Sequence, residues 1–287
     1  MTGRVRSRVR IGDVEVIAII DGEIPGPPDA MYAEVPAPER AAAVAGFVDR
    51  ASGNFVFTIG SYLLAMPDDR LVLVDTGIGP NPVQPSMGGG LRSGLLAVGV
   101  QPEDVDDVVF THLHFDHIGW AAQGGAPFFP NATYRADRRD WEHFMAPDYE
   151  PAAFEHYATR IETDRAGVRL APVADRLELW DPGEGILPGL SSWDAPGHTP
   201  GTSALVIESR GERGALLGDI AHSIPELLNG WPFRSHLEQE RATASNVATR
   251  EWLADEGLLC SGSHFPGLEW GYVRRTGGNY TWEVYNR

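Results

Sequence analysis

Cysteine is almost absent from this sequence, which contains a single one, Cys260, among 287 residues. One thiol excludes an intramolecular disulfide framework. Long apolar runs are also missing, since none approaches the roughly 18 residues that cross a bilayer. Asp13 and Glu15 interrupt the first apolar stretch, residues 11–20, before a signal-peptide core can form. These absences lead us to expect a cytoplasmic protein.

Positive charge is scarce as well. Lys and Arg total 23 against 40 Asp and Glu, which gives a net charge of −17. Nucleic acids and anionic lipid surfaces attract Lys and Arg, so we expect neither nucleic acid nor membrane among the partners. The chain has strands expected in both halves, no internal repeat and no low-complexity linker. We therefore expect one domain spanning residues 1–287.

Apolar and alternating runs predict an α/β protein. The run at 71–74 is apolar throughout, which is typical of a strand buried on both faces. Strands are expected at 14–20, 55–59, 62–66, 71–74, 108–110, 133–135, 177–180, 192–195, 202–208, 215–217, 258–261 and 272–274. Helices are expected at 39–50, 91–98, 137–165 and 240–256.

Histidine is concentrated in one place. Residues 111–117 read Thr-His-Leu-His-Phe-Asp-His and directly follow an expected strand. His112, His114, Asp116 and His117 put four metal-capable side chains within six residues, although the whole chain has only nine histidines. Imidazole and carboxylate suit zinc, iron or manganese. The pattern favours a metal site over a loop that is histidine-rich by chance.

Three more candidates stand at strand ends beside glycine: His198, Asp219 and His264. Glycine allows the backbone to approach closely, and functional loops gather at strand ends. A lone histidine after a strand is more often a surface or core residue. Three such placements together with the cluster favour one shared site.

The combined pattern resembles the metallo-β-lactamase superfamily. The resemblance rests on the His-x-His-x-Asp-His motif at 112–117, followed in order by His198, Asp219 and His264, with support from residues 74–77 and 197–201. It implies an αββα sandwich, with two mixed sheets face to face and helices outside. It also implies a binuclear metal site at one edge of the sandwich.

The resemblance assigns a role to each ligand. One metal falls to His112, His114 and His198, the second to Asp116, His117 and His264, and Asp219 bridges both. Seven side chains are too many for one tetrahedral zinc but suit two ions that share a carboxylate and a water. Such ions, about 3.5–4 Å apart, can bind a hydroxide whose pKa falls to about 7. Zinc is expected, with iron, manganese and cobalt open.

Two departures from other branches narrow the expectation. Asp219 stands where some β-lactam-hydrolysing members use sulfur, which disfavours β-lactamase activity. His114 stands where the diiron flavoprotein branch has Glu, which disfavours oxygen or nitric oxide reduction. Cys260 lies four residues before His264 in an apolar strand, and we interpret it as a buried thiol rather than a ligand.

Residues 113–117 with Gly119 resemble the N-acyl homoserine lactonases, while 218–222 and 263–267 also resemble the methyl parathion hydrolase relatives. The lactonases carry a Tyr three residues after the bridging Asp, and His222 holds that position here. His222 could act there as a donor or general acid, or be an ordinary loop histidine. Asp116 and His222 are the expected catalytic side chains.

Other residues near the motifs receive weaker interpretations. Asp75 is expected to hold a ligating histidine or the loop at its strand end. Core packing is the more common role for large aromatics, although a pocket lining is also open. The aromatics concerned are Trp120, Trp193, Trp231 and Phe233. No role is assigned to His143, His156 or His236.

The expected function is binuclear metal-dependent hydrolysis of a small molecule, opening a lactone or cleaving a related small ester. A phosphotriester is the next candidate, followed by a β-lactam or thioester. A metal-dependent nuclease or phosphodiesterase shares the fold, but the acidic balance weighs against it. A metal-binding module without activity is the third class. The sequence leaves the oligomeric state open.

Overall fold

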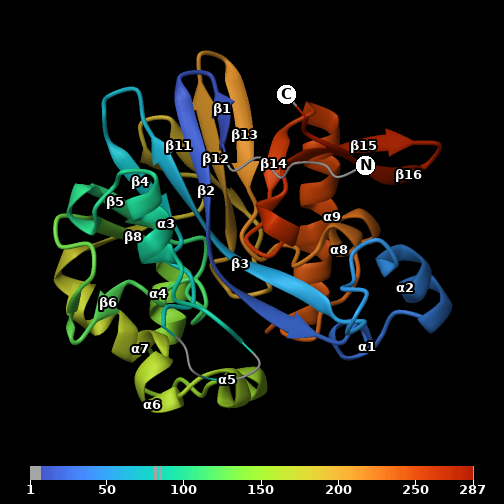
Figure 1. Ribbon diagram of the computed structural model, residues 1–287, viewed down its shortest axis with the longest axis horizontal. Coiled ribbons are helices and arrows are strands. Elements are labelled where there is room, and N and C mark those ends of the chain that lie inside the picture. The colour runs from blue at the N-terminus through green and yellow to red at the C-terminus, as the bar shows by residue number, and fades with distance from the viewer. Residues whose placement is uncertain (1–7, 81–82, 84–85, 287) are drawn as a thin grey trace.

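In the computed structural model, which describes residues 8–80, 83 and 86–286, two seven-stranded sheets lie face to face with helices outside them (Figure 1). The first sheet has the strand order β1-β2-β3-β4-β5-β8-β9. Its strands are β1 (Arg8–Ile11), β2 (Val14–Gly26), β3 (Phe55–Ala65), β4 (Leu71–Val74), β5 (Asp107–Val109), β8 (Thr133–Asp137) and β9 (Leu177–Trp180).

The second sheet is built by the later part of the chain, in the order β10 to β16. Its strands are β10 (Gly185–Leu187), β11 (Leu190–Asp194), β12 (Ser203–Ser209), β13 (Glu212–Leu216), β14 (Leu259–Ser261), β15 (Gly271–Thr276) and β16 (Asn279–Val284). A small hairpin pairs β6 (Ala122–Gln123) with β7 (Ala126–Pro127). Both large sheets mix parallel and antiparallel pairs, because β4–β5, β5–β8, β8–β9 and β13–β14 are parallel. The αββα expectation is confirmed.

Helices cover the outer face of each sheet. α3 packs on β2 and α4 on β8 and β9, whereas α8 and α9 pack beside β16 and β15. The α-helices are α1 (Pro28–Met31), α2 (Ala37–Val44), α3 (Leu91–Ala97), α4 (Arg138–Phe144), α5 (Ala153–Ala158), α6 (Ile161–Asp164), α7 (Ala166–Arg169), α8 (Ile224–Asn229) and α9 (Gln239–Glu256). The described residues also include the 3-10 helices η1 (Pro102–Asp104), η2 (Ala171–Arg176) and η3 (Pro266–Leu268).

The two sheets share a core. It forms because successive side chains along each strand point to opposite faces of the sheet. Leu205 and Ile207 of β12 point into the space between the sheets, while Ala204 and Val206 point out toward the helices. β4 is buried on both faces, with Leu73 on the outer side and its valines between the sheets. An apolar run without polar alternation is therefore what this position requires.

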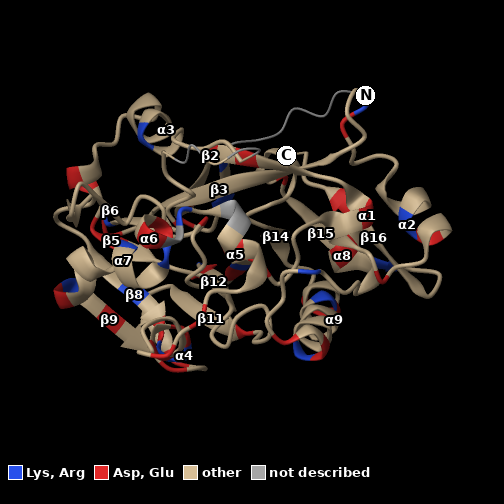
Figure 2. Ribbon diagram, turned by 90° about the horizontal axis from the view of Figure 1, so that it is seen from below, with Lys and Arg blue, Asp and Glu red and all other residues tan. Residues whose placement is uncertain are grey.

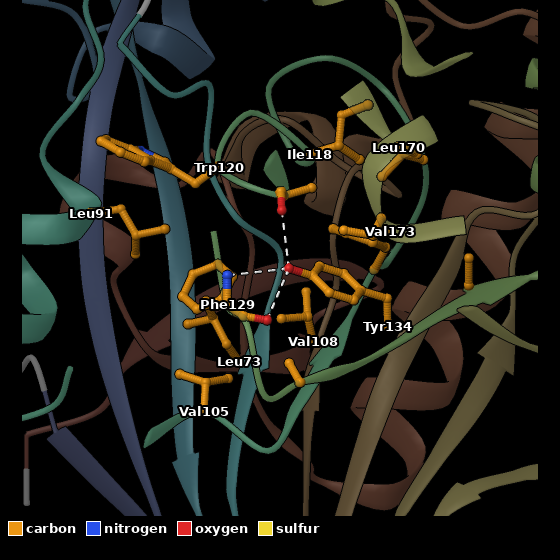
Figure 3. Packing of buried hydrophobic residues seen from close by; sticks show 14 of the residues in the cluster. Leu73, Leu91, Val105, Val108, Ile118, Trp120, Phe129, Tyr134, Leu170 and Val173 are labelled. Atoms are coloured by element: carbon orange, nitrogen blue, oxygen red, sulfur yellow. Dashed lines mark hydrogen bonds between the residues drawn. The ribbon is translucent and has the colours of Figure 1, made fainter. Parts of the chain in front are cut away.

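The outer core of the first sheet is centred on Tyr134, whose ring is fully buried (Figure 3). Its hydroxyl donates to the carbonyl of Ala121 at 3.0 Å and accepts from the amide of Phe129 at 3.3 Å. A buried phenol needs such partners to offset its lost hydration. These bonds fasten the segment that follows the histidine cluster to the sheet.

Gly60 explains one difference from the expected elements. The sequence predicts two strands separated at this glycine, but β3 runs continuously from Phe55 to Ala65. A Cβ at position 60 would overlap the side chain of Leu268. The glycine therefore serves close packing against η3 and does not end the strand.

The expected helix at 137–165 is wrong as a single element. The segment forms α4, α5 and α6 with irregular chain between them, and Pro147 and Pro151, which cannot continue a helix, account for the break between α4 and α5. The expected helix at 39–50 begins earlier and ends earlier, as α2. Strands β1, β10 and β16 and helix α8 were not foreseen, and β2 continues six residues beyond the expected strand, to Gly26.

The helix expected at 240–256 is confirmed as α9, whose inner face buries Trp252 and Leu253. Its outer face carries basic and acidic residues interleaved along the ribbon (Figure 2). Among the described residues, no helix is long and apolar enough to cross a membrane.

Candidate metal centre

Aligned strand ends place the candidate ligands together. β4 and β5 pair in parallel with Val74 opposite Val109, and β13 and β14 pair in parallel with Leu216 opposite Ser261. The carboxyl ends of parallel strands meet at one edge of a sheet. Consequently the loops that begin at Asp75, Phe110, Leu217 and Gly262 start from one end of the sandwich. The turn from β11 to β12 adds the loop that carries His198.

The first group of ligands converges closely. His112 Nε2 lies 3.1 Å from His114 Nδ1, which lies 2.8 Å from His198 Nε2. All three rings are buried, and one ion could contact all three nitrogens. The sequence motif and the distant His198 are therefore brought to one point, as expected.

The second group lies beside the first. His264 Nε2 lies 3.5 Å from Asp116 Oδ2 and 3.2 Å from Asp219 Oδ2, and His117 Nε2 lies 3.2 Å from Asp219 Oδ1. Asp219 also approaches the first group, at 3.3 Å from His198 Nε2. Its carboxylate thus stands between the two groups, where a bridging ligand would lie.

These separations fit metal coordination. Ligand atoms around a tetrahedral zinc at about 2.05 Å lie about 3.3 Å from one another. His117 Nε2 and Asp219 Oδ1 are buried, face one another at 3.2 Å, and have no hydrogen-bond partner within the described part of the chain. Buried polar atoms without partners are costly, and an ion held between them would satisfy both.

The two histidines of the second group, His117 and His264, are each oriented through Nδ1. Asp75 Oδ2 lies 2.8 Å from His117 Nδ1, as the sequence predicts, and Asp75 also accepts from the amide and hydroxyl of Thr111. His264 Nδ1 meets the carbonyl of Thr58 at 2.7 Å. Such contacts fix the tautomer that leaves Nε2 free for a metal.

Asp140 joins the two loops that carry the first group. It accepts from the amide of Leu113 at 3.0 Å, between two ligands, and from the hydroxyl of Thr199 and the amide of Gly201, beside His198. Burial raises the pKa of Asp140 to about 7 despite these donated hydrogen bonds. The sequence offered no signal for this residue, because it lies on α4, far from every motif.

Electrostatics favours proton-free imidazoles in the first group, whereas the carboxylates of Asp219, Asp75 and Asp116 outweigh burial and raise the pKa of His117 well above 6.5. Burial and neighbouring imidazoles lower the pKa of His112 and of His114 well below 6.5, and burial lowers that of His198 to about 4. Burial opposes ionisation of Asp219, but the surrounding histidines outweigh it and hold its pKa well below 3.8. Neutral imidazoles and an ionised carboxylate are the forms that coordinate metals.

His222 faces the same centre, with Nε2 at 3.2 Å from Asp219 Oδ2. Its ring stacks on Phe233, with centroids 3.7 Å apart and planes 16° apart. Burial opposes protonation of His222, but the carboxylates of Glu226 and Asp219 outweigh it and raise the pKa to about 9. The interpretation of His222 as an ordinary loop histidine is wrong, because the side chain is buried at the site.

No metal-binding motif in the sequence indicates the next two residues of this site, His236 and Glu226. His236 Nδ1 lies 3.1 Å from His198 Nδ1, and Glu226 Oε1 lies 3.3 Å from His222 Nδ1. Glu226 has a faint signal, since Ser223-x-x-Glu226 is a capping-box spacing and Ser223 does cap α8. The contacts to the histidines come only from tertiary packing.

A cavity of about 310 Å³ opens over the centre. Its floor is polar, with His114, Asp116, His198, Asp219, His222 and His264. Its walls are mainly apolar, with Ile24, Met31, Phe57, Phe115, Phe154 and Phe233. A polar floor under apolar walls is typical of a small-molecule site.

The remaining residues singled out in the sequence separate into core and pocket. Phe233 lines the cavity, whereas Trp120 packs in the outer core of the first sheet and Trp231 in a cluster with Tyr32. Trp193 stacks on Trp252 of α9. Cys260 is confirmed as a buried thiol, and burial raises its pKa.

Fold and site together identify the family: residues 56–264 match the metallo-beta-lactamase superfamily, and the chain belongs to it. Among curated relatives, the N-acyl homoserine lactonase AttM of Azorhizobium caulinodans is 36% identical over 122 residues. That match covers 41% of this chain and 41% of AttM, so it spans about two fifths of the relative's length.

Solved structures extend the likeness to the whole fold. One is a hydrolase named AbOPH, with a TM-score of 0.86, 22% identity, and coverage of 100% of this chain and 99% of its own. Another is AidC, described as a dizinc quorum-quenching lactonase in complex with a product, with a TM-score of 0.84, 23% identity, and coverage of 98% and 97%. At these sequence identities the similarity shows the fold alone.

Proposed function

We propose that this chain is a binuclear metal hydrolase that opens the ring of a lactone carrying an apolar arm, of the N-acyl homoserine lactone class. The observation that carries the proposal is the convergence of seven buried imidazole and carboxylate side chains beneath a largely apolar cavity. The relatives named N-acyl homoserine lactonase support this substrate class.

The ligand geometry supports two metal positions. His112 Nε2, His114 Nδ1 and His198 Nε2 would hold one ion. Asp116, His117 Nε2 and His264 Nε2 would hold the other, with Asp219 between them. Two divalent ions, zinc first, would lower the pKa of a water between them and polarise the substrate carbonyl.

The cavity walls favour an uncharged substrate with a hydrocarbon arm. Phe57, Phe154 and Met31 offer apolar surface that would remove such an arm from water, at about 25 cal/mol for each Å² buried. The polar groups gather on the floor, so a lactone would place its ester there and its arm along the walls.

His222 is suited to assist the leaving oxygen. Opening a lactone leaves an alkoxide at the other end of the same molecule. This oxygen must gain a proton to become the hydroxyl group of the product. His222 Nε2 faces the floor of the cavity beside Asp219, where it would meet that oxygen and donate. The stack on Phe233 holds the ring in this direction.

The test is metal analysis of the purified protein followed by rates on lactones, aryl esters, phosphotriesters and β-lactams. We expect two metal ions per chain and the highest kcat/KM on an N-acyl lactone. His112→Ala should lose metal and activity, while His156→Ala, which changes an exposed histidine on α5, should retain both.

Two outcomes would contradict the proposal. One is less than one metal per chain with His112→Ala as active as the parent. The other is a phosphotriester that turns over faster than every lactone, which would indicate the phosphotriesterase alternative.

A further inference from the structure

Glu226 is a buried carboxylate that lies behind the proposed catalytic centre and touches two of its histidine side chains. Its relative exposure is 0%, and it stands in the first turn of α8. A carboxylate at such depth is unfavourable unless donors surround it. The donors around Glu226 therefore indicate what it is placed to hold.

Oε2 of Glu226 is anchored from the scaffold side. It accepts from the Tyr32 hydroxyl at 3.0 Å and from the backbone amide of His222 at 2.9 Å. The Tyr32 oxygen also lies 2.6 Å from Ser223 Oγ, which itself accepts from the amide of Glu226 at 3.2 Å. These contacts fix the carboxylate and leave Oε1 facing the site.

Oε1 meets the two imidazoles. It lies 3.3 Å from His222 Nδ1 and 3.7 Å from His236 Nε2. His236 Nε2 is buried and has no hydrogen-bond partner within the residues that the structure describes, and Glu226 Oε1 faces it at ion-pair distance. An ionised carboxylate only accepts hydrogen bonds, so the facing nitrogen of each ring should carry a proton.

His236 also contacts His198, one of the three histidines of the first ligand group. His198 turns Nε2 to the first ligand group, and with a metal bound there its Nδ1 would carry the proton and donate to His236 Nδ1, 3.1 Å away. That donation would put the His236 proton on Nε2, toward Glu226. His117 has a carboxylate in this supporting position, whereas His198 has an imidazole with Glu226 beyond it.

We propose that Glu226 is the positioning residue that fixes His222 and, through His236, the metal-facing His198. By accepting a hydrogen bond from His222 Nδ1, it holds the ring with Nε2 toward the floor of the cavity. One carboxylate thus orients both a substrate-facing ring and a metal-facing ring. The part of this inference that concerns substrate rests on the function proposed above.

Glu226→Gln tests the inference with little change in volume. The glutamine oxygen can face either the Tyr32 side or the histidines, but not both, and its amide group then meets a donor. Glu39→Gln is the matched control, because Glu39 is exposed and accepts from Trp231. His236→Asn breaks the route to His198 while leaving Glu226 beside His222.

The first readout is long-range ¹⁵N–¹H NMR of the histidine rings in the metal-free protein, which reports tautomers without any turnover. We expect a proton on His222 Nδ1 in the parent and in Glu39→Gln, and an Nδ1 signal that is shifted or lost in Glu226→Gln. The second readout is Zn²⁺ titration, in which Glu226→Gln and His236→Asn should bind one of two ions about 10–100-fold more weakly. On a hydrolysed substrate, Glu226→Gln should lower kcat more than it changes KM.

Unchanged ring signals and unchanged zinc affinity in folded Glu226→Gln would overturn the inference. A third zinc in the parent that is lost in Glu226→Gln would also overturn it, because Glu226 would then be a ligand. Should Glu226→Gln fail to fold, unaltered zinc affinity in His236→Asn would by itself reject the His198 route. A tautomer change in a protein that hydrolyses nothing would leave the positioning role standing and reject the proposed function.

Discussion

Asp75 Oδ2 lies 2.8 Å from His117 Nδ1, and the same carboxylate accepts from the amide of Thr111. Asp75 therefore orients the His117 ring and the start of the motif loop, residues 111–117, together. Its backbone has a φ of 55°, in the left-handed region that Asp and Asn tolerate better than other residues.

Asp75→Asn should weaken binding of one metal by about 10–100-fold, because the neutral amide is a poorer acceptor for the His117 proton. Asn keeps the left-handed backbone, so the fold should persist. Asp69→Asn is the matched control, since Asp69 has a φ of 66° in an exposed turn. Zinc titration with a competing chelator measures the effect, and equal affinities in both variants would contradict it.

Asp140→Asn should weaken the hydrogen bonds that join the motif loop to the loop of His198. An amide offers one accepting oxygen, so one of the three donors now on Asp140 loses its partner, at about 1–3 kcal/mol. Urea unfolding of the parent and variant at neutral pH measures this difference. No change in the free energy of unfolding would show that these hydrogen bonds do not contribute to stability.

The same pair of proteins tests a pH dependence. Without metal, burial raises the pKa of Asp140 to about 7, above the value of about 3.9 in an unfolded chain. The folded state binds this proton more tightly, so the contribution is fully present below about pH 4 and is lost as pH rises through about 7. The stability advantage of the parent over Asp140→Asn, corrected for the lost hydrogen bond, should therefore shrink from about pH 4 to 7. A constant difference would contradict this assignment.

The sequence predicted which side chains would converge, because they lie at strand ends that local patterns reveal. The apolar run at 71–74 and the parallel register of Val74 with Val109 mean that strand ends determine where Asp75 and His112 lie. His198, Asp219 and His264 follow the same rule. At these residues, the pattern along the chain is enough to predict which side chains lie together in space.

The supporting residues could not be found in this way. Asp140, Glu226 and His236 reach the centre from helices or loops whose local sequence has no metal motif, and their contacts depend on how the outer layers pack. Gly60 is a second case, because the strands expected at 55–59 and 62–66 form one strand through this glycine, which packs against Leu268. Tertiary contacts decide both cases.

Gly119→Ala should destabilise the loop after the histidine cluster. The Gly119 amide donates to the carbonyl of Gly77 at 2.7 Å, and an added Cβ would overlap the backbone of Ile78. Forcing these two segments apart costs about 1–3 kcal/mol or more. Gly46→Ala is the control, because no atom lies within 4 Å of its added Cβ. Thermal unfolding compares the two, and equal melting temperatures would refute the close approach.

His222→Ala should lower kcat on a lactone by about 10²–10⁴-fold while the zinc content stays at the parental level. The reason is the position of Nε2 beside Asp219 at the floor of the cavity, where the leaving oxygen would need a proton. Removing a donor used mainly in the transition state should change KM much less. A lactone whose leaving alcohol is more acidic needs less help, so it should lose less rate in the variant. An undiminished kcat with both metals in place would rule out this role for His222.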